Sequence, residues 1–210
     1  MKLPKTAHGI CKLGVLIAGL GASACWAGGK YEEFLSLHLG STSATQLDAQ
    51  VGSSIDALDM SSGQSVSLGY GLQENYWRIL LQLNQTTADI KVAGTADSQG
   101  SLTSTAIMYN VYWVPEIDYG ISAIVGAGVG YANQDIKNVT VAANKAESIS
   151  RGGWSAKMAL GVEYRACKEA SIQLVFENWL TDAVQDDKVP GWSVKDVGHQ
   201  EISIGALYRF

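Results

Sequence analysis

The sequence of 210 residues has few prolines, few charges and no long apolar run. Only 3 residues are proline and 17% are charged, although 47% are hydrophobic. No run approaches the roughly 18 consecutive apolar residues of a membrane-spanning helix. The scarcity of proline, together with 23 glycines, favours long strands with tight packing over a loop-rich domain.

The first 27 residues have the pattern of a secretion signal. A positively charged flank precedes a short apolar core, and small residues follow the core. We therefore predict a signal peptide at residues 1–27 and one mature domain at residues 28–210. The positive flank contains Lys2, Lys5 and Lys12. The apolar core is Leu13 to Leu20, and the small residues are Gly21 to Ala24.

Three processing events fit the end of this leader. Cleavage after Ala24 and cleavage after Ala27 both follow small residues. Cys25 also permits attachment of lipid, because a small residue precedes it. Against lipid attachment, Ala22 stands where a lipoprotein signal usually carries leucine.

Removal of the leader changes the charge and the cysteine count. Loss of three lysines from 15 basic and 20 acidic residues leaves a net charge of about −8. A chain this acidic has no basic footprint for nucleic acid. Cys167 is then the one certain cysteine, so no intramolecular disulfide is available. No cofactor is expected, and no regular calcium-loop spacing is present.

Eight segments of the mature chain alternate apolar and polar residues, which is the period of a strand with two different faces. In the last segment Ile202 and Ile204 share one face, while Glu201 and Ser203 share the other. The eight segments lie at about residues 31–42, 64–72, 77–87, 101–114, 121–131, 154–165, 172–177 and 201–210.

The polar faces of these strands are sparsely charged. They carry glycines and isolated charges, without the dense lysine and glutamate of a solvated surface. A narrow barrel explains this pattern, because its apolar faces meet lipid while a few long charged side chains meet inside. We expect an internal polar network formed by Arg78, Lys157, Glu163, Glu177 and Arg209.

Aromatic residues gather at the predicted strand ends. Girdles of aromatic rings at the two membrane interfaces have this distribution, because an amphipathic ring is stable at the depth of the lipid headgroups. We expect the interface set to be Trp77, Trp113, Tyr131, Trp154, Tyr164, Tyr208 and Phe210.

The connections between the strands alternate in length. Tight turns are expected at 73–76, 115–119 and 166–170, on the side where both chain ends lie. This arrangement requires an even number of strands, and in outer-membrane proteins the short turns are periplasmic. The sequence predicts an all-β, membrane-spanning, closed antiparallel up-and-down barrel of eight strands in a Gram-negative outer membrane. Long polar loops are expected at 43–63, 88–100, 133–152 and 182–199.

Two stretches resemble a known family. Met108 to Trp113 followed by Val125 to Ala132 resembles the outer-membrane β-barrel family, which includes opacity-type porins and outer-membrane protein A-like eight-stranded barrels. The final residues, with Ala206, Tyr208 and Phe210 in alternation, resemble the C-terminal signal of that family. The resemblance implies export, recognition by the barrel-assembly machinery and insertion into the outer membrane.

An eight-stranded barrel is filled by its own side chains, which argues against a conducting pore. The long loops then remain as a displayed surface for host molecules, other cells or lipopolysaccharide. We predict a monomeric, non-enzymatic surface barrel with an adhesion or envelope-interaction role. A narrow pore stays open as an alternative.

Two other classes of protein, a lipid A-modifying enzyme and a soluble carrier, fit this sequence less well. A lipid A-modifying barrel enzyme needs a serine, a histidine and a carboxylate close together. His199 precedes Glu201 and Ser203 on one face, but that face points into the lumen, and His38 is expected to be a buried, hydrogen-bonded imidazole. A soluble lipocalin-like carrier conflicts with the terminal aromatic residue and the weakly charged faces.

Overall fold

β-Strands form nearly all of the described chain. The computed structural model describes residues 31–44, 47–51, 54–60, 62–92, 98–141, 144–181, 184–185, 192–195 and 198–210. The predicted signal peptide and its three processing points lie outside these residues. Among the described residues, no helix is long and apolar enough to cross a membrane.

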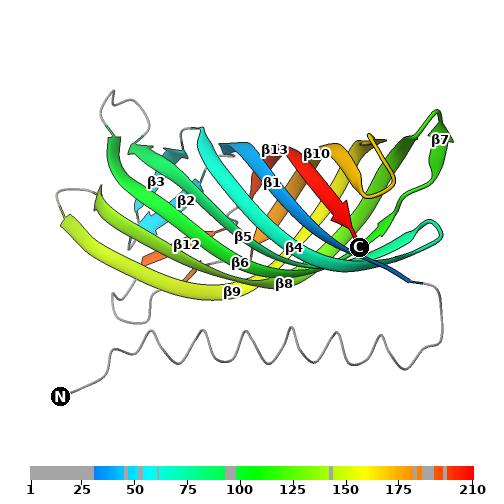
Figure 1. The fold of residues 1–210 in the computed structure, drawn as a ribbon. Helices are drawn as coiled ribbons and strands as arrows, with labels where there is room; N and C mark the ends of the chain where they lie inside the picture. Colours follow the sequence, from blue (N-terminus) through cyan, green and yellow to red (C-terminus); the bar gives the residue numbers. More distant parts are fainter. Residues whose placement is uncertain are drawn as a thin grey trace, which may run out of the picture. The chain divides into compact units, whose positions relative to one another are not determined.

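Eight long strands close into a barrel, as predicted (Figure 1). Each strand pairs antiparallel with its neighbours in chain order, and the pairing of β1 with β13 joins the first strand to the last. The pairing of β5 with β6 completes the ring. The eight strands are β1 (Glu32–Ala44), β4 (Gly63–Glu74), β5 (Trp77–Val92), β6 (Ser98–Trp113), β8 (Ile121–Val141), β9 (Asn144–Arg165), β10 (Ala170–Thr181) and β13 (His199–Arg209).

Tight turns connect the strands at the end of the barrel where β1 begins and β13 ends. Asn75, at the turn between β4 and β5, has a φ of 53°, a left-handed value that asparagine tolerates better than most residues. The turn between β6 and β8 contains the short strand β7 (Glu116–Asp118), which pairs with the start of β8. Tyr119 and Gly120 close this turn with φ values of 47° and 78°.

At the opposite end of the barrel, strands form within segments that were predicted to be loops. Four short strands there are β2 (Leu47–Val51), β3 (Ser54–Met60), β11 (Val184–Gln185) and β12 (Trp192–Lys195). They lie toward the left of Figure 1, away from β7 and the C-terminus.

These short strands continue the wall of the barrel. β2 pairs with β3 in the same register in which β1 pairs with β4. The same continuity links the β11–β12 pair to β10–β13, and the β2–β12 pair to β1–β13. β3 pairs with the outer end of β5. Segments from the first and last connections therefore meet in one hydrogen-bonded ladder.

The prediction of long irregular loops was wrong for much of the four outer connections. β5 extends to Val92 and β6 begins at Ser98, while β8 extends to Val141 and β9 begins at Asn144. The reason is that strand pairing satisfies backbone N–H and C=O groups wherever the chain lies. Apolar alternation appears only where one face must meet lipid or pack. Outside the membrane the strands stay hydrogen-bonded, but their sequence no longer alternates between apolar and polar residues.

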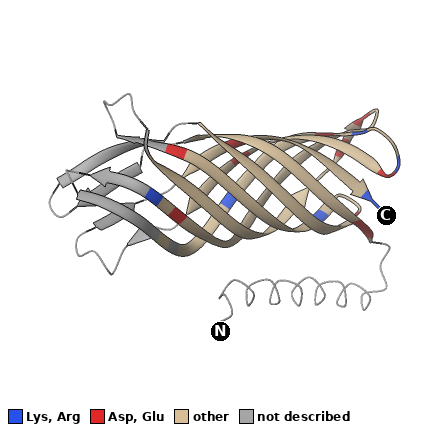
Figure 2. Cartoon of the chain, turned by 60° about the vertical axis from the view of Figure 1, so that its left-hand side comes forward, with Lys and Arg blue, Asp and Glu red and all other residues tan. Residues whose placement is uncertain are grey.

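The two faces of the wall are inverted relative to a soluble barrel. Lys157 is 2% exposed, whereas its neighbour Met158 is 68% exposed. The same alternation of buried and exposed residues runs along β10 and β13. Figure 2 shows that charged residues are few along the described strands. Exposed apolar side chains on every long strand create a surface that only lipid can cover.

The height of this apolar surface matches an outer membrane. On β9 the exposed face runs from Trp154 to Tyr164, both of which are aromatic. Ten residue steps at roughly 3.3 Å, tilted by about 40°, span roughly 25 Å along the barrel axis. The apolar band of outer-membrane barrels has this height. The rest of β9, Asn144–Gly153, continues outward beyond the band.

Candidate functional site

A group of buried charges fills the periplasmic end of the interior. Glu163 on β9 accepts hydrogen bonds from Arg78 on β5 at 2.8 Å and from Arg209 on β13, and all three side chains are almost fully buried. Gln173 donates to the same carboxylate at 2.6 Å. We name Arg78, Glu163 and Arg209 the periplasmic charge group. Glu32, at the exposed rim, lies 3.7 Å from Arg209 and adds a second acid.

A second group of charges lies farther out. The ammonium of Lys157 on β9 donates to Glu177 on β10 at 2.7 Å and to Gln82 on β5 at 2.6 Å. The second carboxylate oxygen of Glu177 accepts from Nε1 of Trp179 at 3.1 Å. Lys157 also sits 4.8 Å from the centre of the Trp179 ring, within the range of a cation–π contact.

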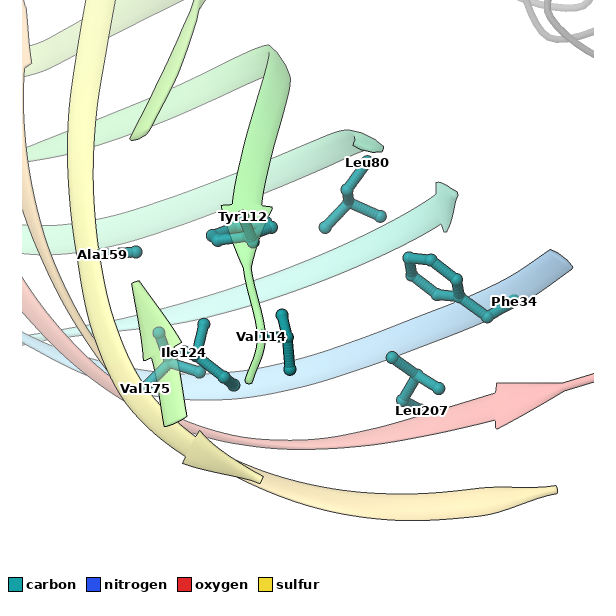
Figure 3. Packing of buried hydrophobic residues seen from close by; sticks show 8 residues of the cluster. All are labelled: Phe34, Leu80, Tyr112, Val114, Ile124, Ala159, Val175 and Leu207. Carbon is teal, nitrogen blue, oxygen red and sulfur yellow. The ribbon is translucent and has the colours of Figure 1, made fainter. Parts of the chain in front are cut away.

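Apolar side chains separate these two groups. Figure 3 shows the side chains of this apolar layer gathered inside the ring of strands. On β5, Leu80 lies between Arg78 and Gln82, and on β10, Val175 lies between Gln173 and Glu177. An apolar layer of this kind makes the passage of ions along the lumen energetically unfavourable. The layer, which we call the septum, consists of Phe34, Leu80, Tyr112, Val114, Ile124, Ala159, Val175 and Leu207.

Two glycines on β4 allow the septum to pack. A Cβ at Gly71 would meet the ring of Phe34, and one at Gly69 would meet the side chain of Leu80. These glycines leave the space that the two larger side chains occupy. A cavity of about 20 Å³ remains within the septum, where polar residues from both sides, such as Arg78 and Glu177, also line it. That volume suits roughly one water molecule and is far too small for a channel.

A further buried acid on the outer side of the septum is Glu201 on β13, which pairs with Glu177 in the ladder. Its Oε1 accepts a hydrogen bond from Ser65 at 2.6 Å. Its Oε2 is buried and has no hydrogen-bond partner, and neither has Nε2 of His199 two residues earlier. The ring of His199 stacks on Trp179, with centroids 5.3 Å apart.

The histidines do not form a serine–histidine–acid arrangement. Ser203 lies 3.5 Å from Nδ1 of His38, on β1, and not beside His199. His38, His199 and Ser203 are all buried inside the barrel. A lipid substrate outside the wall has no contact with these groups, so the geometry does not support attack on lipid A.

The predicted interface aromatics are exposed on the outside of the wall. Trp77 pairs across the ladder with Trp113 at the periplasmic end, and Tyr131 pairs with Trp154 toward the outer end. The Tyr131 and Trp154 rings meet edge to face at 6.4 Å. Tyr208 and Phe210 stack near the end of β13.

No metal centre is evident in the part of the chain that the structure describes, because no three His, Cys, Asp or Glu side chains converge there. Cys167 is exposed in the turn between β9 and β10 and is not in a disulfide.

The structure places all five charges of the predicted network inside the barrel, but in two separate groups. Sequence analysis missed the septum, because Val175 and Leu207 are apolar residues on the otherwise polar phase of their strands. It also missed the glutamines Gln82 and Gln173 as partners of the charges. The alternation of each strand showed that these glutamines point inward. Their partners depend on the register between strands, which a two-residue period does not encode.

Comparison with known proteins identifies the family. Residues 13–210 match the family of the outer membrane protein beta-barrel domain. The chain belongs to this family. The family places the barrel in the outer membrane of Gram-negative bacteria, as its exposed apolar band requires. No curated protein matches the sequence.

Solved structures of other proteins share the fold at low sequence identity. Neisserial surface protein A is 14% identical, with a TM-score of 0.56 over 84% of this chain and 97% of that one. OprG from Pseudomonas aeruginosa is 14% identical, with a TM-score of 0.60 over 87% and 98%. AlkL is 13% identical, with a TM-score of 0.54 over 87% and 91%. At these identities the likeness establishes the architecture alone.

Proposed function

We propose that this outer-membrane barrel is a monomeric, non-enzymatic surface protein that acts through its outer end. Its role is contact with host molecules, other cells or lipopolysaccharide. The observation that carries this proposal is the in-register continuation of the barrel wall beyond the apolar band. A ladder that joins distant segments holds them in one shape before a partner arrives, which reduces the entropy lost on binding.

The packing of the interior argues against a pore and so favours a role for the outer end. The septum crosses the lumen, and the charges next to it form ion pairs, Arg78 with Glu163 on one side and Lys157 with Glu177 on the other. A conducting pore needs a continuous polar path, and the packing of Phe34 and Leu80 against the glycines of β4 opposes one. Neither a pore nor an enzyme finds comparable support in the described residues.

Assembly of the barrel depends on its last strand in this proposal. Ala206, Tyr208 and Phe210 alternate on the exposed face of β13, which closes the barrel against β1. We propose that the barrel-assembly machinery recognises this terminal pattern. The expected partners are therefore outer-membrane lipid, lipopolysaccharide and the assembly machinery, with a cell-surface ligand at the outer end.

A binding comparison tests the surface role. The intact barrel is compared with a variant whose β8–β9 hairpin is cut back to Lys137 and Ser148, which face each other in the ladder, and rejoined by a two-residue turn. A second variant shortens residues 182–197. We expect the trimmed barrels to lose at least about tenfold in binding to immobilised lipopolysaccharide or to cells, roughly 1.4 kcal/mol. Equal binding by all three proteins would overturn the surface role.

Conductance in planar bilayers tests the closed lumen. We expect the native barrel to show no steady single-channel current. The double variant Phe34→Ala/Leu80→Ala should conduct ions. It removes the two large side chains that pack against Gly71 and Gly69. Steady currents from the native protein would contradict a sealed interior.

A further inference from the structure

The charges inside the barrel do not balance on the outer side of the septum. The periplasmic charge group sets two arginines against Glu163 and the nearby Glu32. On the outer side, the buried charged side chains that the structure describes are one lysine, Lys157, and two glutamates, Glu177 and Glu201. The septum lies between the two sides, and neither arginine of the periplasmic charge group forms an ion pair with Glu177 or Glu201.

The two outer glutamates stand directly opposite each other. Glu177 on β10 and Glu201 on β13 are partners in the ladder, and both point inward. Like charges in this arrangement repel, and a lumen of low polarity strengthens the repulsion. Lys157 is committed to Glu177 at 2.7 Å. Among the described side chains, no lysine or arginine forms an ion pair with Glu201.

The surroundings of Glu201 point to a missing ligand. Glu201 is 2% exposed and its Oε2 has no partner, although a buried carboxylate oxygen without one is costly. Nε2 of His199, another buried atom without a partner, belongs to the next inward residue of β13. A Cβ at position 40 would meet the Ser65 hydroxyl and the Glu201 carboxylate, so Gly40 lets these two side chains pack closely against β1.

We propose that Glu201 and its neighbours bind one small cation in the outer chamber of the barrel, taken up from the external medium as a proton or as an alkali metal ion. Either source supplies a positive charge to balance the described buried glutamates of the outer chamber. The septum blocks delivery from the periplasm, so the site responds to conditions outside the cell. The charged groups that interact with Glu201 are Glu177 on β10 and Lys157 on β9, and Tyr112 on β6 interacts in turn with Lys157. His38 on β1 and His199 on β13 are also buried in the interior and interact with Glu177 and Lys157.

Thermal unfolding of the purified barrel in detergent tests the site. The native protein, Glu201→Gln and Ser203→Ala are unfolded across a range of pH, each in sodium chloride and in N-methyl-D-glucamine chloride. Ser203 is the matched control, because it is the next inward residue of β13, buried and uncharged. We expect the Tm of the native protein and of Ser203→Ala to rise by several degrees with the bound cation, and that of Glu201→Gln to stay level.

The pattern of the response identifies the cation. Dependence on sodium at fixed pH indicates a metal ion, whereas dependence on pH alone indicates a proton, and both outcomes support the site. A Gly40→Ala barrel, in which the carboxylate is crowded, should show a weaker response than the native one. The same response in Glu201→Gln as in the native protein would overturn the proposal.

Discussion

Glu163 is the side chain on which the periplasmic half of the interior depends. It accepts from two arginines and one glutamine that come from three different strands. Removal of a buried ion-pair partner costs more than the pair contributes, because the remaining charges stay buried without compensation. The alternation of β9 predicted that Glu163 points inward. The sequence also placed Arg78 and Arg209 in one network with Glu163. Which charges pair within that network, and the role of Gln173, depend on which strands face each other across the lumen.

Glu163→Gln should therefore destabilise the barrel by about 3–5 kcal/mol. Urea unfolding in lipid bilayers, with refolding to establish equilibrium, measures this change in the free energy of unfolding. Glu32→Gln is the control: its side chain is 59% exposed and 3.7 Å from Arg209, so its loss should cost no more than about 1 kcal/mol. Similar losses in both variants would argue against a special role for burial.

At the scale of elements, the strands divide into a membrane part and an outer part. In the membrane part, lipid on one side and packing on the other impose a two-residue period, so the sequence revealed these segments. In the outer part neither face must be apolar, and the backbone ladder alone holds the strands together. The segments at 88–100 and 133–152 therefore looked like loops, although most of their described residues are strand.

The outer part of the β8–β9 hairpin should be dispensable for folding. Cutting it back to Lys137 and Ser148 removes ladder pairs that lie beyond the apolar band. We expect the trimmed barrel to keep the heat-dependent shift in gel mobility typical of a folded barrel, with a Tm within a few degrees of the native value. Failure of the trimmed chain to fold would mean that the outer ladder nucleates the barrel.

At the scale of the whole molecule, the sequence predicted the closed eight-stranded barrel and its location in the outer membrane. Those features follow from the number of strands and from the inverted faces. The septum was beyond its reach, because Phe34, Leu80 and Leu207 come from distant strands and meet only after closure. A ligand at the outer end is equally invisible to periodicity, since recognition depends on side chains that no repeat imposes.

The central claim is that the apolar faces of the strands meet lipid while the interior is sealed from it. Fluorescence quenching by lipids with brominated acyl chains tests this directly, in variants that each retain one tryptophan. Trp77, Trp113 and Trp154 are 59%, 45% and 71% exposed, and Trp179 is 2% exposed. We predict strong quenching of the first three and none of Trp179. Quenching of Trp179, or protection of the other three, would contradict the account.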